Sequence, residues 1–117
     1  MGIILLFGVN VMKANQIIGL CKKLKHTPLV IPRTDYGKPL GALAGIAGKK
    51  SNAAYSGKEF ENEMMVFSGI PSEELDRFLD AYREAGIAPI QRKAVITPSN
   101  VMWSAEKLYK ELDEHVK

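Results

Sequence analysis

The sequence has one cysteine, Cys21, and two histidines in 117 residues. A single thiol excludes an internal disulfide, and no group of cysteines and histidines has the spacing of a zinc site. No apolar run approaches the roughly twenty residues of a membrane span, and the amino terminus lacks the charged start and cleavage site of a signal peptide. We therefore expect a cytoplasmic protein with no metal, no cofactor and no membrane contact.

The composition indicates a folded domain rather than a disordered chain. Hydrophobic residues make up 46% of the sequence and charged residues 25%, whereas disordered segments combine low hydrophobicity with high net charge. A chain of 117 residues is long enough to bury one core, but a second domain is not expected. We therefore predict a single α/β domain over residues 1–117.

Charge is distributed unevenly along the chain. Residues 1–58 contain nine Lys and Arg against one acid, Asp35, whereas residues 59–117 contain seven Lys and Arg against twelve Asp and Glu. A basic half attracts polyanions by releasing counterions. Tyr36 and Tyr55 are, however, the only aromatics among these basic residues, so the side chains that stack on bases are missing. We do not expect nucleic acid as a partner and keep weak binding through the basic half as an alternative.

Apolar runs and turn residues predict strands that alternate with helices. Residues 33–63 are the exception, since repeated glycines predict a flexible Gly/Lys-rich crossover there. Within it, residues 39–47 could form a short helix. Residues 49–57 are expected to form an exposed loop. Strands are expected at residues 3–7, 29–31, 64–67 and 94–96, the last extended back to residue 91. Helices are expected at residues 11–25, stopped by Pro28, from Ser72 to a terminator at Gly86, and from the cap Ser104 to His115.

This order of elements predicts a small three-layer α/β sandwich. Strands that are apolar on both faces are typical of a sheet covered by helices on both sides. We expect a mostly parallel four-stranded sheet in the order 2-1-3-4, like half of a flavodoxin-type domain. The alternative is a ferredoxin-like α+β sandwich with antiparallel pairs, in which the strand ends do not share one edge.

Polar residues follow the predicted strands and mark a candidate site. In a parallel sheet the carboxyl ends of the strands meet at one edge, where ligands bind and helix amino termini offer free N–H groups to anions. The segment KAVITPSNVMW, residues 93–103, is the most informative part of this edge. The same residue types also form turns and caps, so a structural role stays open for each. The candidate ligand-binding residues are Asn10, Ser68, Lys93, Thr97, Ser99, Asn100 and Trp103.

Other reactive side chains have simpler interpretations. Cys21 lies on the apolar stripe of its helix, which predicts an inert buried thiol. His26 and His115 end separate helices, where we expect solvated histidines.

Three functions follow from these residues. The favoured one is a non-catalytic module that binds a small anionic or polar ligand, or a protein partner, at the strand-end edge. The second is a small enzyme for a phosphorylated or nucleotide substrate, with Lys93 or Arg33 holding charge and Asp35 transferring a proton. No nucleophile has an identifiable base, so no catalytic residue is assigned. The third is the weak nucleic-acid binder, and a homodimer is open in each case.

Two blocks of the second half resemble a known family. They read VFSGIPSEELDRFLDAYREAGI, residues 66–87, and KAVITPSNVMWSAEKLYKEL, residues 93–112. Both are similar to an uncharacterised bacterial family, a conserved domain of unknown function with a KAV-T-P-x-N-x-x-W pattern. The resemblance implies a small cytoplasmic single-domain protein without an assigned activity, and it transfers no catalytic residue.

Overall fold

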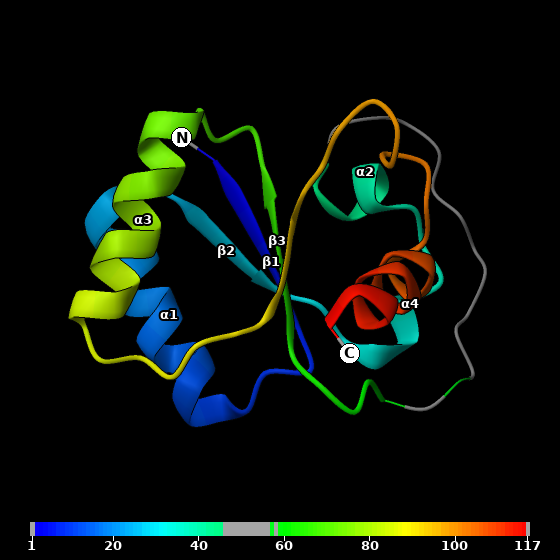
Figure 1. Cartoon of the computed structure of the whole chain (residues 1–117), viewed down its shortest axis with the longest axis horizontal. Coiled ribbons are helices and arrows are strands. Elements are labelled where there is room, and N and C mark those ends of the chain that lie inside the picture. The colour runs from blue at the N-terminus through cyan, green and yellow to red at the C-terminus, as the bar shows by residue number, and fades with distance from the viewer. Residues whose placement is uncertain (1, 46–56, 58, 117) are drawn as a thin grey trace.

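The computed structural model describes residues 2–45, 57 and 59–116. Strands and helices alternate along most of this chain (Figure 1). In chain order the elements are β1 (Ile3–Phe7), α1 (Val11–Leu24), β2 (Thr27–Val30), a 3-10 turn η1 (Arg33–Asp35), α2 (Leu40–Leu43), β3 (Met64–Ser68), α3 (Ser72–Glu84), β4 (Arg92–Val95) and α4 (Ala105–Val116).

Hydrophobic runs and caps explain where these elements begin and end. Nearly all side chains of β1 and β3 are buried, as expected for continuously apolar strands between two helical layers. The side chain of Asn10 caps α1 by accepting a hydrogen bond of 2.8 Å from the Lys13 backbone N–H. α1 ends at Leu24, one residue before the predicted end, and its cap residue Lys25 has a left-handed φ of 63°. α3 ends before Gly86, whose φ of 74° suits a glycine terminator.

The sheet lies between two layers of helices, which confirms the predicted α/β sandwich. Figure 1 shows α1 and α3 on one face and α2 and α4 on the other. Because side chains alternate along a strand, β1 and β3 contribute to two separate cores. The core under α1 and α3 includes Ile4, Leu6, Met65 and Phe67. The core under α2 and α4 includes Leu5, Phe7, Met64 and Val66.

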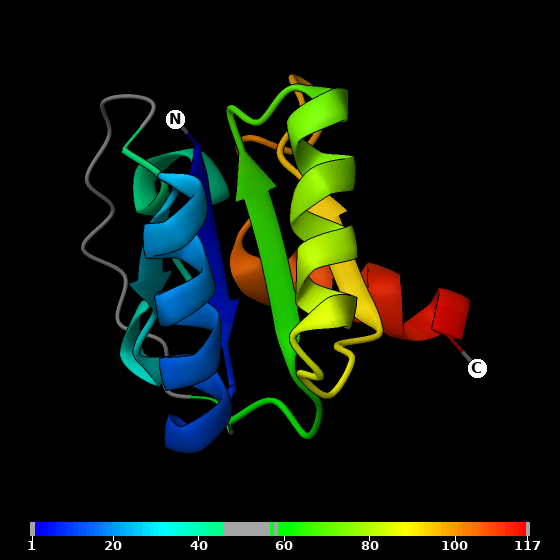
Figure 2. The same ribbon diagram turned by 90° about the vertical axis from the view of Figure 1, so that its left-hand side faces the viewer.

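The strand order is β2-β1-β3-β4, as predicted. β1 and β2 are parallel, and so are β3 and β4, whereas the central pair β1 and β3 is antiparallel. Figure 2 shows the arrows of β1 and β3 pointing in opposite directions. The sheet is therefore mostly parallel, yet the carboxyl ends of its strands lie at two opposite edges, which was the consequence expected of the ferredoxin-like alternative.

The two halves of the chain repeat one arrangement of elements. We call β1, α1, β2 and α2 the first unit, and β3, α3, β4 and α4 the second unit. Leu5 and Val66, the middle residues of β1 and β3, lie directly opposite each other. Gly8 and Gly69 follow these strands with φ values of 65° and 69°. The start of each unit is therefore built in the same way.

Symmetry between the units extends to the starts of α2 and α4. Pro39 and Ser104, the residues before these helices, form an antiparallel bridge. The hydrogen bonds beside this bridge are reciprocal, running from the Gly41 N–H to the Val101 carbonyl oxygen at 2.9 Å and from the Glu106 N–H to the Tyr36 carbonyl oxygen at 3.1 Å. An approximate two-fold axis thus relates the units and passes through the middle of the sheet.

The described part of the crossover between the units contains a short helix. A short helix was expected within residues 39–47, and α2 is present at Leu40–Leu43. The backbone N–H of Leu40 donates to the Trp103 carbonyl oxygen at 2.8 Å, which fixes α2 against the second unit. The loop predicted at residues 49–57 lies almost entirely outside the described residues.

Candidate functional site

The seven residues expected at one edge are divided between the two ends of the sheet. Asn10 follows β1 at the end where β3 and β4 begin, and Lys93 lies near the start of β4. Of the other five, Ser68 is the last residue of β3 and the rest follow β4. All five lie toward the opposite end, because these strands run antiparallel to β1. The antiparallel central pair thus separates residues that a fully parallel sheet brings together.

The loop after β4 uses its polar side chains to hold its own backbone. Asn100 Oδ1 accepts a hydrogen bond of 2.8 Å from the Thr97 N–H, and Asn100 Nδ2 donates to the Val95 carbonyl oxygen at 3.1 Å. Thr97 Oγ1 accepts from the N–H groups of Ser99 at 3.2 Å and Asn100 at 3.3 Å. Ser68 lies at the same end and is buried. Thr97 and Asn100 therefore stabilise a turn.

Trp103 packs against the core under α2 and α4. Its carbonyl oxygen accepts the hydrogen bond from Leu40, and the Lys107 ammonium lies 4.6 Å from the centroid of its ring, which is the geometry of a cation–π contact. These contacts indicate a structural role for the indole of Trp103.

A cleft of about 420 Å³ opens between α3, the connection at residues 85–91 and the start of β4. Its volume falls in the range of small-molecule sites, about 300–1,000 Å³. Apolar side chains form most of its walls, and none of its lining residues is acidic. We call it the α3–β4 cleft; it is lined by Met65, Leu79, Tyr82, Arg83, Ile87, Pro89, Ile90 and Lys93.

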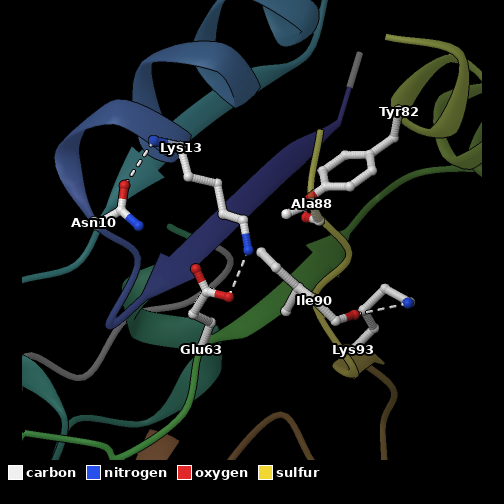
Figure 3. A network of polar contacts seen from close by, with 7 residues as sticks. All are labelled: Asn10, Lys13, Glu63, Tyr82, Ala88, Ile90 and Lys93. Carbon is white, nitrogen blue, oxygen red and sulfur yellow. Dashed lines mark hydrogen bonds and ion pairs between the residues drawn. The ribbon is translucent and has the colours of Figure 1, made fainter. Parts of the chain in front are cut away.

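Tyr82 holds the outer wall of this cleft in place. Its hydroxyl group donates a hydrogen bond of 2.6 Å to the Ala88 carbonyl oxygen in the connection (Figure 3). Burial raises the pKa of Tyr82 to about 12, and the nearby Glu63 carboxylate adds to this effect. The phenol is therefore neutral near pH 7 and keeps its proton for the bond to Ala88.

An ion pair beside the cleft joins the two units. Lys13 Nζ of α1 lies 2.6 Å from Oε1 of Glu63, the residue before β3 (Figure 3). The two side chains are only 11% and 25% exposed, so each charge depends on the other for compensation. The negative charge of Glu63 is thus balanced by Lys13.

Two cationic side chains lie at the rim of the cleft. Lys93 Nζ donates a hydrogen bond of 2.8 Å to the Ile90 carbonyl oxygen (Figure 3), and within the described part of the chain it has no ion-pair partner. Arg83 lies 3.3 Å from Asp80 in a pair that is mostly exposed to water, where such pairs contribute little. Both cations can therefore face a bound anion.

A smaller and more polar crevice lies beside the connection between α1 and β2, where that connection meets α3 of the second unit. Its volume is about 230 Å³. The difference follows from the connections, since α1 and β2 are joined by Lys25 and His26 alone, whereas α3 and β4 are joined by residues 85–91. The crevice is lined by Leu24, Lys25, His26, Glu74 and Arg77.

His26 is buried, with 8% of its surface exposed, so the expectation of a solvated helix-end histidine is wrong. Because the connection is short, the imidazole ring of His26 lies between the units. Its Nδ1 accepts a hydrogen bond of 3.3 Å from the Gly2 N–H. The ring also contacts Phe78 edge-on, with the ring centroids 6.0 Å apart. Cys21 is a free and fully buried thiol, as predicted, and burial raises its pKa to about 11. The side chain of His115 lies outside the described residues.

Sequence reasoning found Lys93 but missed the rest of the cleft. Tyr82 lies on the apolar face of α3 and packs in the core, and its place in the sequence does not distinguish a cleft residue from a core residue. The apolar residues Ile87, Pro89 and Ile90 in the connection could have indicated the cleft. Apolar residues in a loop indicate that the loop packs against the rest of the protein. No local sequence pattern predicts the ion pair between Glu63 and Lys13, because it joins residues from the two units.

In residues 2–45, 57 and 59–116, no group of three or more His, Cys, Asp or Glu side chains is placed to hold a metal ion. Within the same ranges, no helix combines the length and apolar character needed to cross a membrane.

The fold and the cleft define a small α/β protein made of two symmetry-related units, with a cleft of ligand-sized volume in the second unit. Residues 63–115, within the second unit, match the model of a family described as a domain of unknown function (DUF3783). This match confirms the resemblance of the second half to an uncharacterised conserved domain. No curated protein and no solved structure matches the chain.

Proposed function

We propose that this protein is a non-catalytic binding module that holds a small, largely apolar ligand in the α3–β4 cleft. The observation that carries the proposal is a cavity of about 420 Å³ with apolar walls. Water in such a cavity forms few hydrogen bonds with the walls, so an apolar ligand gains free energy by displacing it.

The polar groups at the cleft favour binding over catalysis. Tyr82 is committed to Ala88 through its hydroxyl proton, and its raised pKa makes it a poor proton donor or acceptor near neutrality. Lys93 and Arg83 supply positive charge. The lining residues include no serine, cysteine or carboxylate to act as a nucleophile or general base.

Fluorescence of the neutral dye N-phenylnaphthylamine tests the proposal, because its emission rises when it leaves water. We expect the full-length protein to bind the dye, and the variant Leu79→Trp, whose larger side chain fills the cleft, to lose that binding.

Ile18 provides a matched control for Leu79. Counted from the first residue of each helix, Ile18 on α1 corresponds to Leu79 on α3, and both side chains are partly buried. Ile18→Trp should therefore leave dye binding unchanged. Absence of dye binding to the wild type, or equal loss in both folded variants, would refute the proposal.

A further inference from the structure

We infer that the α3–β4 cleft selects amphiphilic monoanions, with the acyl or aromatic body against the apolar walls and a carboxylate beside Lys93. This inference rests on the proposed binding function and adds the chemical class of the ligand. It follows from the positions of the charges around the cleft.

Lys93 is the best-placed partner for a ligand carboxylate. Its hydrogen bond of 2.8 Å to the Ile90 carbonyl oxygen holds the ammonium against the cleft wall. An ammonium carries three donors, so two remain for a ligand. A hydrogen bond between two charged groups is about twice as strong as a neutral one.

Arg83 adds a second positive charge on the α3 side of the cleft. Its exposed pair with Asp80 is a weak competitor, because water screens both charges. A ligand carboxylate that lies partly out of water is a stronger partner for the guanidinium.

The acidic residue near the cleft does not oppose an anion. Glu63 is close enough to influence the pKa of Tyr82, but its carboxylate lies 2.6 Å from the Lys13 ammonium. The charge of this pair is zero, and the cleft lining adds two positive charges. A neutral head group gains less from this arrangement than a carboxylate does, and a cationic head group is repelled by it.

The first unit lacks this arrangement of positive charges. On the strands, β4 has Lys93 beside Met65, whereas β2 has Pro28 beside Ile4. Each of these pairs joins the second residues of the two strands, so Pro28 takes the place of Lys93. The crevice beside the connection between α1 and β2 also contains an acid, Glu74 of α3. Anion selection is thus predicted for one unit and not for the other.

Displacement of bound N-phenylnaphthylamine by octanoate and by octanamide tests the inference. The two compounds share an apolar chain and differ in charge. We expect octanoate to displace the dye at about tenfold lower concentration than octanamide, the ratio that one charge-assisted hydrogen bond of about 1.4 kcal/mol provides.

Lys93→Met keeps the apolar stem of the side chain and removes its charge. It should abolish most of the preference for octanoate, measured in the variant itself as the ratio of the octanoate and octanamide concentrations that displace half of the dye. Lys107→Met removes an exposed cation on α4, on the other face of the sheet, and should preserve the preference.

The outcomes separate the two proposals. Dye binding with equal displacement by octanoate and octanamide would overturn anion selection and leave the binding function standing. Equal loss of preference in Lys93→Met and Lys107→Met would also overturn it, since the effect would then come from net charge. Absence of dye binding would refute the binding function itself.

Discussion

The two units of this protein have the same architecture and different surfaces. Each contains a strand, a helix on one face, a parallel strand and a helix on the other face. In the first unit the helix and the second strand are joined by Lys25 and His26, and the crevice there is small and polar. In the second unit the connection at residues 85–91 leaves an apolar cleft with cations at its rim. A change in one connection is therefore enough to give one unit a ligand-sized cavity.

The largest expected effect concerns the shared core, where the units should behave alike. Ile17 on α1 and Phe78 on α3 hold the same position in their helices and are both completely buried. We expect Phe78→Ala to reduce the free energy of unfolding by about 3–5 kcal/mol and Ile17→Ala by about 2–5 kcal/mol. Urea unfolding followed by circular dichroism measures both. A loss below about 1 kcal/mol at either position would show that the unit concerned adds little to one common core.

A smaller effect is expected where the polar contacts of the units differ. Glu63 precedes β3 and pairs with the partly buried Lys13, whereas Gly2 precedes β1 and donates a hydrogen bond to Nδ1 of His26. Glu63→Gln should cost about 1–3 kcal/mol, because it leaves a poorly solvated ammonium without its counter-charge. His26→Leu should cost less, about 0.5–1.5 kcal/mol.

A double-mutant cycle with Lys13→Met separates the ion pair from the packing of its side chains. The cycle should give a coupling energy between positions 13 and 63. Additive losses would mean that the contact does not stabilise the junction of the units.

The smallest effect concerns alkaline pH, where two equivalent positions carry different acids. Cys21 and Tyr82 hold the same place in α1 and α3, and burial raises their pKa values from 9.0 to about 11 and from 10.0 to about 12. Both folded-state pKa values lie above the unfolded-state values. The neutral thiol of Cys21 therefore stabilises the fold fully below pH 9.0, and the neutral phenol of Tyr82 does so below pH 10.0. Their contributions are lost as pH rises through about 11 for Cys21 and about 12 for Tyr82.

Urea midpoints measured at a series of alkaline pH values test this assignment. Cys21→Ala should flatten the decline in stability that begins near pH 9.0, and Tyr82→Phe the decline that begins near pH 10.0. If neither variant changes the slope, ionisation of these two groups does not control alkaline unfolding.

Much of the fold could be predicted because local patterns match the final elements. The apolar run at β1 and the amphipathic segment at α3, which starts after Pro71 and ends before Gly86, contain their own start and stop signals, and the structure places them where these signals indicate. Residues 33–63 could not be predicted in the same way. α2 has only the residues Leu40–Leu43 and depends on hydrogen bonds to Val101 and Trp103, far away in the sequence.

The candidate site was less predictable than the fold. The expectation of one polar edge assumed that all strand ends meet, and the reversed direction of β3 separates Asn10 from Thr97 and Asn100. Those two loop residues look the same in sequence whether they bind a ligand or their own backbone, and only their hydrogen bonds distinguish the two roles.

The sequence by itself determined the strand and helix types, the covered sheet and its strand order, because hydrophobic periodicity and caps act over a few residues. The tertiary structure decided the antiparallel join of β1 and β3, the symmetry of the two units and the cleft at residues 85–91. These features depend on contacts between residues far apart in the chain. Hydrophobic periodicity contains no information about the direction in which one packed unit meets another. Side-chain packing across the junction of the two units sets that direction.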